Sequence, residues 1–381
     1  MLSPILTTNH FFGRHLMKRF VYVALLTFAV PGLTLLYGQP PAAGDKTLAD
    51  VLKELSDAAA KSYVSPIVSG FGSNLNSGWF HRAPRATMFG FDLEFGIVGM
   101  ATFFPNDTKS FTSNGSFRFT AAQAADLAIK SGAPVGAPRT AVQNAILSQP
   151  FGVTFSGPTI TGSQKDSMRV IFTGANNVGG TGFNLPSQTY PLPIVGIMGE
   201  VTAIPLVAPQ LSIGTFFGTQ LTFRYLPTYT VEDFGEIKYF GFGAQHNPGV
   251  WFGDILPLEL SASFFTQSLE AGSIFKTKAT AFGVNASKRL GWGFLNITPY
   301  GGFMVESSSM TFAYDYIIAT QVGPSAQKIE FELTGENKTR VTAGLSIKVL
   351  IVNINADYSW AKYNSASIGL MFIINEEYRL P

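Results

Sequence analysis

The sequence contains no cysteine among its 381 residues, and charged residues are scarce. The missing cysteine excludes a disulfide scaffold, a cysteine-ligated zinc or iron–sulfur site, and a lipoprotein anchored through cysteine. Only 13% of the residues are charged, whereas an ordinary soluble domain carries about 25%. The formal net charge of +2 gives no electrostatic reason to bind nucleic acid. Phenylalanine (34 residues) and glycine (39 residues) are abundant instead, which is not the composition of a disordered chain.

The N-terminus has the layout of an export signal. A basic pair that begins at Lys18 precedes a short apolar run over residues 20–36, and this order is typical of a secretory signal peptide. A proline interrupts the run, whereas a membrane-spanning helix needs about 20 apolar residues. We therefore predict a signal peptide over residues 1–38, with 1–16 as an upstream extension and Met17 as the expected start. An uncleaved inner-membrane anchor is the alternative.

After this signal, apolar residues recur at every second position. Over residues 89–97 the odd positions are all apolar, and the even positions are all glycine, aspartate or glutamate. Such alternation predicts a strand with one apolar and one polar face. Strand signals of this kind lie at 89–97, 151–156, 168–173, 211–225, 236–245, 258–268, 275–288, 293–305, 309–317, 328–334, 340–349, 352–360 and 366–374.

Many of these segments reach the length of about 9–11 residues that a transmembrane β-strand needs. Aromatic residues near several strand ends resemble the girdles of membrane barrels. We therefore predict an all-β fold, a transmembrane antiparallel β-barrel of about 12–14 strands with a short N-terminal helical plug or cap. A secreted β-sandwich is the alternative, although its strands would be shorter.

We place the barrel at residues 86–381, and we expect a helix before it. Apolar residues recur at helical spacing within Thr47–Val64, and we expect Pro66 to end this helix. Residues 39–85 are therefore predicted to be an N-terminal helix and plug region. The helix plugs or covers the barrel mouth, or alternatively docks a partner. Two further helices are expected in an insert at about 120–150.

Charged residues on the polar faces of the predicted strands are the candidates for a functional site. A lysine or arginine that faces lipid costs about 2–4 kcal/mol at the membrane midplane, so these side chains are expected to face the lumen. They are Asp92, Glu94, Arg224, Arg340, Lys348 and Asp357. They could brace the lumen with ion pairs or form a constriction, and their mixed sign argues against a strongly ion-selective pore.

Sequence motifs for catalysis and cofactor binding are missing. Outside the export region only His81 and His246 remain, without the spacing of a metal site. Neither a GxSxG motif nor a dinucleotide-binding glycine motif occurs. We therefore predict no catalytic residues, no metal and no cofactor, and hence no enzyme. A barrel-embedded hydrolase that pairs one histidine with a serine is kept as a third hypothesis.

Four stretches carry a resemblance to a known family. They are Tyr63–Pro105, Gly218–Thr228, His246–Pro257 and Asn364–Leu370. The chain resembles an uncharacterised family of exported outer-membrane β-barrel proteins of the Bacteroidota type. The resemblance implies an outer-membrane barrel and no established activity. More loosely, the architecture is similar to that of outer-membrane long-chain fatty-acid and hydrocarbon transporters.

Our leading hypothesis is a barrel in the bacterial outer membrane that passes or binds small hydrophobic molecules. The expected partners are outer-membrane lipid, a small hydrophobic ligand and the outer-membrane assembly machinery, and nucleic acid is not expected. A non-transporting structural or surface-display barrel is the alternative. An open lumen would favour transport, whereas a lumen filled by ion-paired side chains would favour the alternative.

Overall fold

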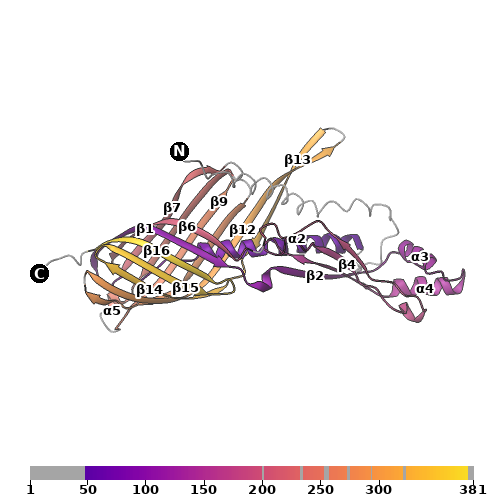
Figure 1. Cartoon of the computed structure of the whole chain (residues 1–381), viewed down its shortest axis with the longest axis horizontal. Helices are drawn as coiled ribbons and strands as arrows, with labels where there is room; N and C mark the ends of the chain where they lie inside the picture. Colours follow the sequence, from indigo (N-terminus) through magenta and orange to yellow (C-terminus); the bar gives the residue numbers. More distant parts are fainter. Residues whose placement is uncertain are drawn as a thin grey trace, which may run out of the picture. The chain divides into compact units, whose positions relative to one another are not determined.

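The computed structural model describes residues 48–199, 201–231, 235–252, 257–272, 275–292, 294–320 and 323–375. The predicted signal peptide lies outside the described residues. Two compact units make up the chain (Figure 1). Unit 1 comprises Asn106–Val201 and the chain before Ile67, and unit 2 comprises Ile67–Pro105 and Thr202–Pro381.

Unit 2 contains a closed antiparallel barrel of ten strands, which confirms the predicted fold class. Around the ring the order is β1 (Phe89–Phe103), β6 (Ala203–Phe216), β7 (Thr219–Val231), β8 (Gly235–His246), β9 (Glu259–Ala271), β10 (Phe275–Ser287), β12 (Leu295–Thr320), β14 (Thr339–Val349), β15 (Val352–Trp360) and β16 (Ser365–Asn375). The ring closes because β1 pairs with both β6 and β16. A closed ring leaves no sheet edge with unpaired backbone groups.

The expected number of 12–14 strands is too high, because alternation marks strands without assigning them to a sheet. The segments 151–156 and 168–173 are β3 (Phe151–Pro158) and β4 (Arg169–Phe172) of a separate sheet. The segments 293–305 and 309–317 are one strand, β12, and 328–334 lies in β13 (Gly323–Thr334), which pairs only with β12. Conversely, 211–225 contains a turn and contributes to both β6 and β7. A short strand, β11 (Leu290–Trp292), also pairs with β12.

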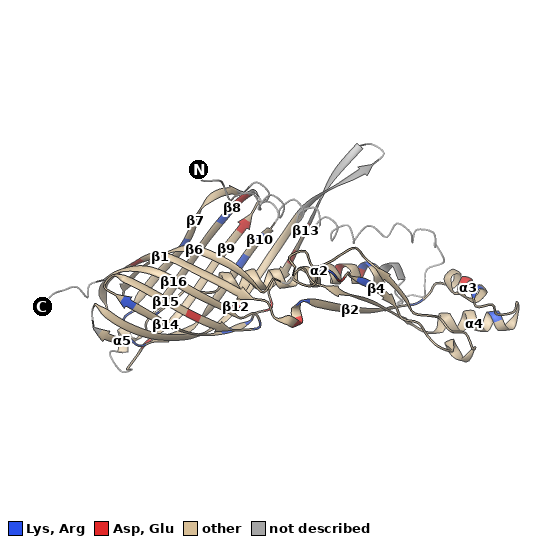
Figure 2. Cartoon of the chain, viewed as in Figure 1, with Lys and Arg blue, Asp and Glu red and all other residues tan. Residues whose placement is uncertain are grey.

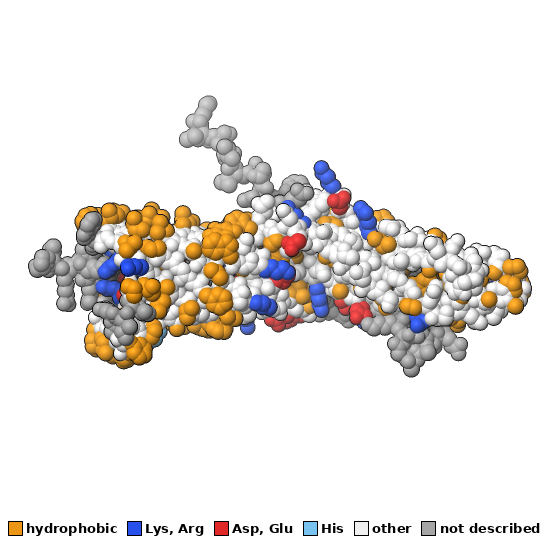
Figure 3. Space-filling model, turned by 90° about the horizontal axis from the view of Figure 1, so that it is seen from below, with side chains coloured by type: hydrophobic (Ala, Val, Ile, Leu, Met, Phe, Trp, Pro, Cys, Tyr) orange, Lys and Arg blue, Asp and Glu red, His pale blue; other side chains and the backbone are white. Residues whose placement is uncertain are grey.

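The barrel wall is apolar on the outside and polar on the inside. In β1, Phe95 and Ile97 are exposed, while Asp92 and Glu94 are buried, and β14 shows the same alternation. Hydrophobic side chains gather over this part of the molecule (Figure 3), and charged residues are few along the strands (Figure 2). A soluble protein has the reverse arrangement, with its polar side chains outside and its apolar side chains inside. The arrangement here matches the outward apolar band of a membrane barrel.

In the part of the chain that the structure describes, we find no helix with the length and hydropathy of a membrane span.

Unit 1 has a four-stranded sheet of its own in the order β2 (Ser110–Phe117), β3, β4 and β5 (Gln188–Pro191). Helices α3 (Ala121–Lys130) and α4 (Ala137–Ser148) follow β2, in the region where two helices were expected. They lie in a segment, Asn106–Val201, that is longer than the expected insert. Three short helices complete the described elements of the chain: η1 (Asn106–Thr108), η2 (Val178–Gly180) and α5 (Gly249–Phe252).

Helix α2 (Leu48–Leu75) is longer than the sequence indicates, and the expectation that Pro66 ends it is wrong. A proline inside a helix removes one backbone hydrogen bond, but the residues after Pro66 gain partners in unit 2, as described below. Before Pro66 the helix packs within unit 1. A Cβ on Gly115 of β2 would lie 3.0 Å from side-chain atoms of both Val51 and Leu55, so the glycine allows the helix and the strand to approach closely.

The outward face of β14 provides a test of the membrane-facing wall. Leu345 lies in the middle of the strand and is 44% exposed, whereas Val349, at the strand end, is 49% exposed. We expect Leu345→Arg to destabilise the barrel in a bilayer by about 2–4 kcal/mol, and Val349→Arg by about 0–1 kcal/mol. Urea titrations of folding into vesicles, read by the gel-mobility difference between boiled and unboiled samples, measure both. Equal effects of the two variants would contradict a lipid-facing β14.

Candidate functional site

The lumen of the barrel is occupied by residues Ile67–Ala86 of unit 2, which we call the luminal segment. It comprises the last turns of α2 and the stretch that leads into β1. Hydrogen bonds join it to several strands. Asn74 Nδ2 donates to Ile204 O on β6 at 2.7 Å, and Ser77 Oγ donates to Ser365 Oγ on β16 at 2.8 Å. On β10, Ser287 Oγ accepts from Ala83 N at 2.9 Å. The chain itself therefore occupies a large part of the lumen.

Two arginines of the wall bind the C-terminal end of α2, where backbone carbonyls lack partners within the helix. Arg340 Nη2 donates to Ser73 O at 2.8 Å, and Arg224 Nη1 donates to Ser77 O at 3.0 Å. A third carbonyl, Leu75 O, accepts from the side chain of Gln267. Positive charge is favourable at this end of a helix because of the helix dipole. The two arginines therefore hold the luminal segment, and do not line an open pore.

Arg82 of the luminal segment joins two acids of β1. Its guanidinium contacts both Asp92 and Glu94, and Arg82 Nε lies 3.0 Å from Glu94 Oε1. The two carboxylates are 0% and 1% exposed. Gln220 Nε2 donates to Glu94 at 3.3 Å, and His81 Nε2 lies 3.4 Å from the same carboxylate without the alignment of a hydrogen bond. Buried charges of this kind are stable only when they are paired.

Aromatic rings fill the space between the two polar clusters. Trp79 is 2% exposed and stacks on Phe265 of β9, with ring centroids 5.0 Å apart. The Arg224 guanidinium lies 4.2 Å from the centre of the Trp79 ring, a cation–π contact. A Cβ on Gly241 of β8 would lie 2.8 Å from Trp79 Cη2. The glycine thus makes room in the wall for the largest side chain of the luminal segment.

The charges of the other two predicted residues also interact with these clusters. Asp357 of β15 accepts from Tyr300 Oη of β12 at 3.0 Å and from Ser367 Oγ of β16 at 2.6 Å, so it links three strands of the wall. Lys348 lies near the end of β14 and lines a cavity described below. All six predicted residues are 8% exposed or less. The structure brings Asp92 together with Glu94 and places Arg224 and Arg340 on the same helix end.

Sequence reasoning missed two charged residues that complete these clusters. Arg82 was not predicted as a site residue because it belongs to no strand. Two acids on the same face of a strand nevertheless indicate that a cation lies nearby. Glu306 of β12 lies 3.1 Å from Arg340 and is 4% exposed. It falls just beyond the predicted strand 293–305, and extending the alternation by one residue would have found it.

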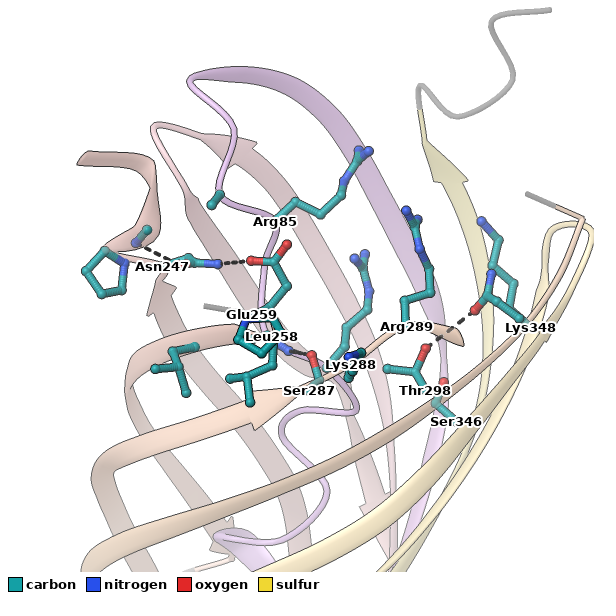
Figure 4. Close-up of a pocket in the computed structure, with 18 of the residues that line it drawn as sticks. Arg85, Asn247, Leu258, Glu259, Ser287, Lys288, Arg289, Thr298, Ser346 and Lys348 are labelled. Carbon is teal, nitrogen blue, oxygen red and sulfur yellow. Dashed lines mark hydrogen bonds between the residues drawn. The ribbon is translucent and has the colours of Figure 1, made fainter. Parts of the chain in front are cut away.

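A cavity of about 530 Å³ opens at the end of the barrel where β10 ends and β14 meets β15 (Figure 4). Five of its 21 lining residues are basic, and Glu259 is the acid among them. The Glu259 carboxylate accepts from the side chain of Asn247. The basic residues are Arg82, Arg85, Lys288, Arg289 and Lys348.

Neither histidine has the neighbours of a catalytic residue in the part of the chain that the structure describes. His246 Nδ1 lies 3.0 Å from Thr219 Oγ1, and its Nε2 accepts from Trp251 Nε1 at 3.2 Å. His81 lies beside Glu94, and we observe no hydrogen bond from a serine hydroxyl to either ring among the described residues. Within the same residues, no group of three or more histidine, aspartate or glutamate side chains could hold a metal ion.

Removing the Arg82 charge tests whether the acids of β1 depend on it. We expect Arg82→Met to lower the free energy of unfolding by about 3–5 kcal/mol, because two carboxylates are left buried without a counter-charge. Asp92→Asn together with Glu94→Gln, added to the same chain, should restore part of the loss. Urea titration of the reconstituted protein measures each variant. Lys238→Met, which removes an exposed ion pair with Glu236, is the matched control and should change stability by about 0–1 kcal/mol.

Comparisons with known proteins identify the family of the chain. No curated protein matches the chain. The N-terminal β-barrel domain of Pseudomonas aeruginosa OprF is 10% identical, covers 41% of this chain and 96% of its own, and gives a TM-score of 0.19. A loop-deletion mutant of OmpT, an outer membrane protein of Vibrio cholerae, is 11% identical. The match covers 75% of this chain and 99% of the OmpT chain, with a TM-score of 0.22. The transport unit of the Escherichia coli autotransporter AIDA-I is 8% identical. The match covers 81% of this chain and 98% of the AIDA-I chain, with a TM-score of 0.23.

A family model matches residues 17–374, which is nearly the whole chain. That span includes every strand of the barrel except the last residue of β16, and also the whole luminal segment. The chain therefore belongs to the family of unknown function DUF6588.

Proposed function

We propose that the protein is a barrel of the bacterial outer membrane, exported by its signal peptide, whose lumen is closed by its own luminal segment. The observation that carries this proposal is the set of buried polar contacts between this segment and the wall. Arg82 binds β1, while Arg340 on β14 and Arg224 on β7 bind the end of α2. A segment held from several directions keeps ions and solutes from crossing.

Passage of small hydrophobic molecules, the hypothesis that led from the sequence, has less support. The apolar part of the lumen is taken up by Trp79, Phe80 and the rings that they contact. A hydrophobic solute would have to displace these rings, together with the arginines that bind the helix end. The surface-display alternative requires no such movement, and we propose it as the function.

Display follows from how the barrel connects to unit 1. The chain crosses between the units at Pro66, Pro105 and Val201. Their neighbours in unit 2 meet at one end of the barrel, since Phe103 pairs with Ala203 and the Ser69 hydroxyl accepts from Glu336 N, between β13 and β14. The longest connection of the barrel, residues 104–202, lies at this end, together with short connections from β7 to β8, from β9 to β10 and from β15 to β16. At the other end β6 joins β7 and β14 joins β15 through short turns, and β8 joins β9 through residues 247–258. In membrane barrels short turns face the periplasm and longer connections face outward.

The proposed role therefore needs no catalytic residue, metal or cofactor. Its partners are outer-membrane lipid around the apolar wall and the assembly machinery that inserts the barrel. Unit 1 would be carried on the cell surface, joined to the barrel by three crossings of the chain.

Labelling of intact cells tests the proposed orientation. An epitope placed at Gly136, between α3 and α4, should be accessible to antibody on intact cells. A Cβ there would have no heavy atom within 4 Å, so there is room for an insertion, and Gly136 itself is kept because its φ of +103° favours glycine. An epitope at Leu350, in the turn between β14 and β15, is the matched control and should be labelled only after the outer membrane is permeabilised.

The reverse pattern, with Leu350 accessible and Gly136 protected, would contradict the display of unit 1. Protection of both epitopes on intact cells would contradict it as well. In each variant, a gel-mobility difference between boiled and unboiled samples verifies that the barrel has formed.

A further inference from the structure

The cavity at the end of the barrel where β14 meets β15 has an excess of positive charge among the described residues. Arg82 is already engaged by Asp92 and Glu94. Four other cations line the same cavity. Among the described residues Glu259 lines it with them, and Asp92 and Glu94 of β1 also attract them. Like charges repel, so a cluster of this composition costs stability unless a ligand of opposite charge binds it.

Arg85 provides the observation that points to a ligand. Its Nε is buried and has no hydrogen-bond partner, although a buried donor without a partner is costly. Its side chain extends toward the same open region as those of Arg289 and Lys348 (Figure 4). Burial and the positive charges of Arg85 and Arg82 lower the pKa of Arg289. These cations therefore repel one another, and a bound anion would reduce this repulsion.

We propose that this cavity binds a phosphate-bearing ligand, with Arg85 and Arg289 as its principal contacts. The planar guanidinium groups of arginine match the oxygens of a phosphate group in a two-pronged geometry. Among the described residues five cations stand against three acids, Glu259, Asp92 and Glu94. This excess of two positive charges favours a ligand with two negative charges over a single carboxylate. The cavity volume of about 530 Å³ falls in the range of small-molecule sites.

Apolar residues beside the cations fit a ligand with a lipid tail as well as a free phosphate. Phe252 of α5 is 69% exposed, and Leu258 also lines the cavity. Exposed aromatic residues at the end of a membrane barrel commonly lie at the level of the lipid headgroups. The shared chemistry is the phosphate group, and the two sources are distinguished by experiment.

Calorimetric titration of the purified full-length protein in neutral detergent tests the proposal with two probes. One is inorganic pyrophosphate, and the other is a short-chain phosphatidic acid. We expect saturable binding of at least one probe, weakened about tenfold or more in Arg85→Gln/Arg289→Gln, which loses two charge-assisted contacts. Binding of pyrophosphate indicates a free phosphate compound, and binding of phosphatidic acid alone indicates a headgroup.

The matched control is Lys238→Gln/Lys276→Gln, which removes two positive charges outside the cavity, each from an exposed ion pair. It should bind the probes as the unmodified protein does. The proposal is overturned if neither probe binds, or if the two double variants bind with equal affinity. A gel-mobility difference between boiled and unboiled samples shows that each variant is folded, so a loss of binding is not a loss of the barrel.

Discussion

The pairing of buried charges inside the barrel is the constraint on which the rest of the structure depends. A wall that presents phenylalanine and isoleucine to lipid must turn its alternate residues inward, and some of these are charged. Asp92 and Glu94 are almost fully buried, so they need a cation. Arg82 supplies it from the luminal segment, which ties the path of the chain before β1 to the charges on β1 itself.

Barrel size and the luminal segment fit each other. Eight strands leave an interior that side chains alone can fill, and the diameter grows with strand number. Ten strands therefore leave room for an additional stretch of chain, and residues Ile67–Ala86 occupy it. Gly241 makes room for Trp79, and Arg224 and Arg340 satisfy the carbonyls at the end of α2. The contacts that place the luminal segment in the lumen also bind the end of helix α2. The same contacts therefore close the lumen and stabilise the barrel.

Sequence periodicity was enough to predict the barrel, because a lipid-facing wall imposes strict alternation on every strand. It could not predict the strand number, since β3 and β4 alternate in the same way in another sheet. It could not place Arg82 either, because a residue outside any strand has no periodic signal. Pro66 misled the prediction, because local propensity favours an end to the helix and the partners of the following residues are distant in sequence.

Electrical recording from the reconstituted protein tests the central claim, the closed lumen, most directly. In planar bilayers the full-length protein should show no steady ion conductance. Arg82→Met, which frees the luminal segment from β1, should show channel openings, whereas Lys238→Met should stay silent. A steady open-channel current from the unmodified protein would contradict the account, because a lumen filled by Trp79, Phe80 and the ion pairs of Arg82 leaves no continuous path for ions.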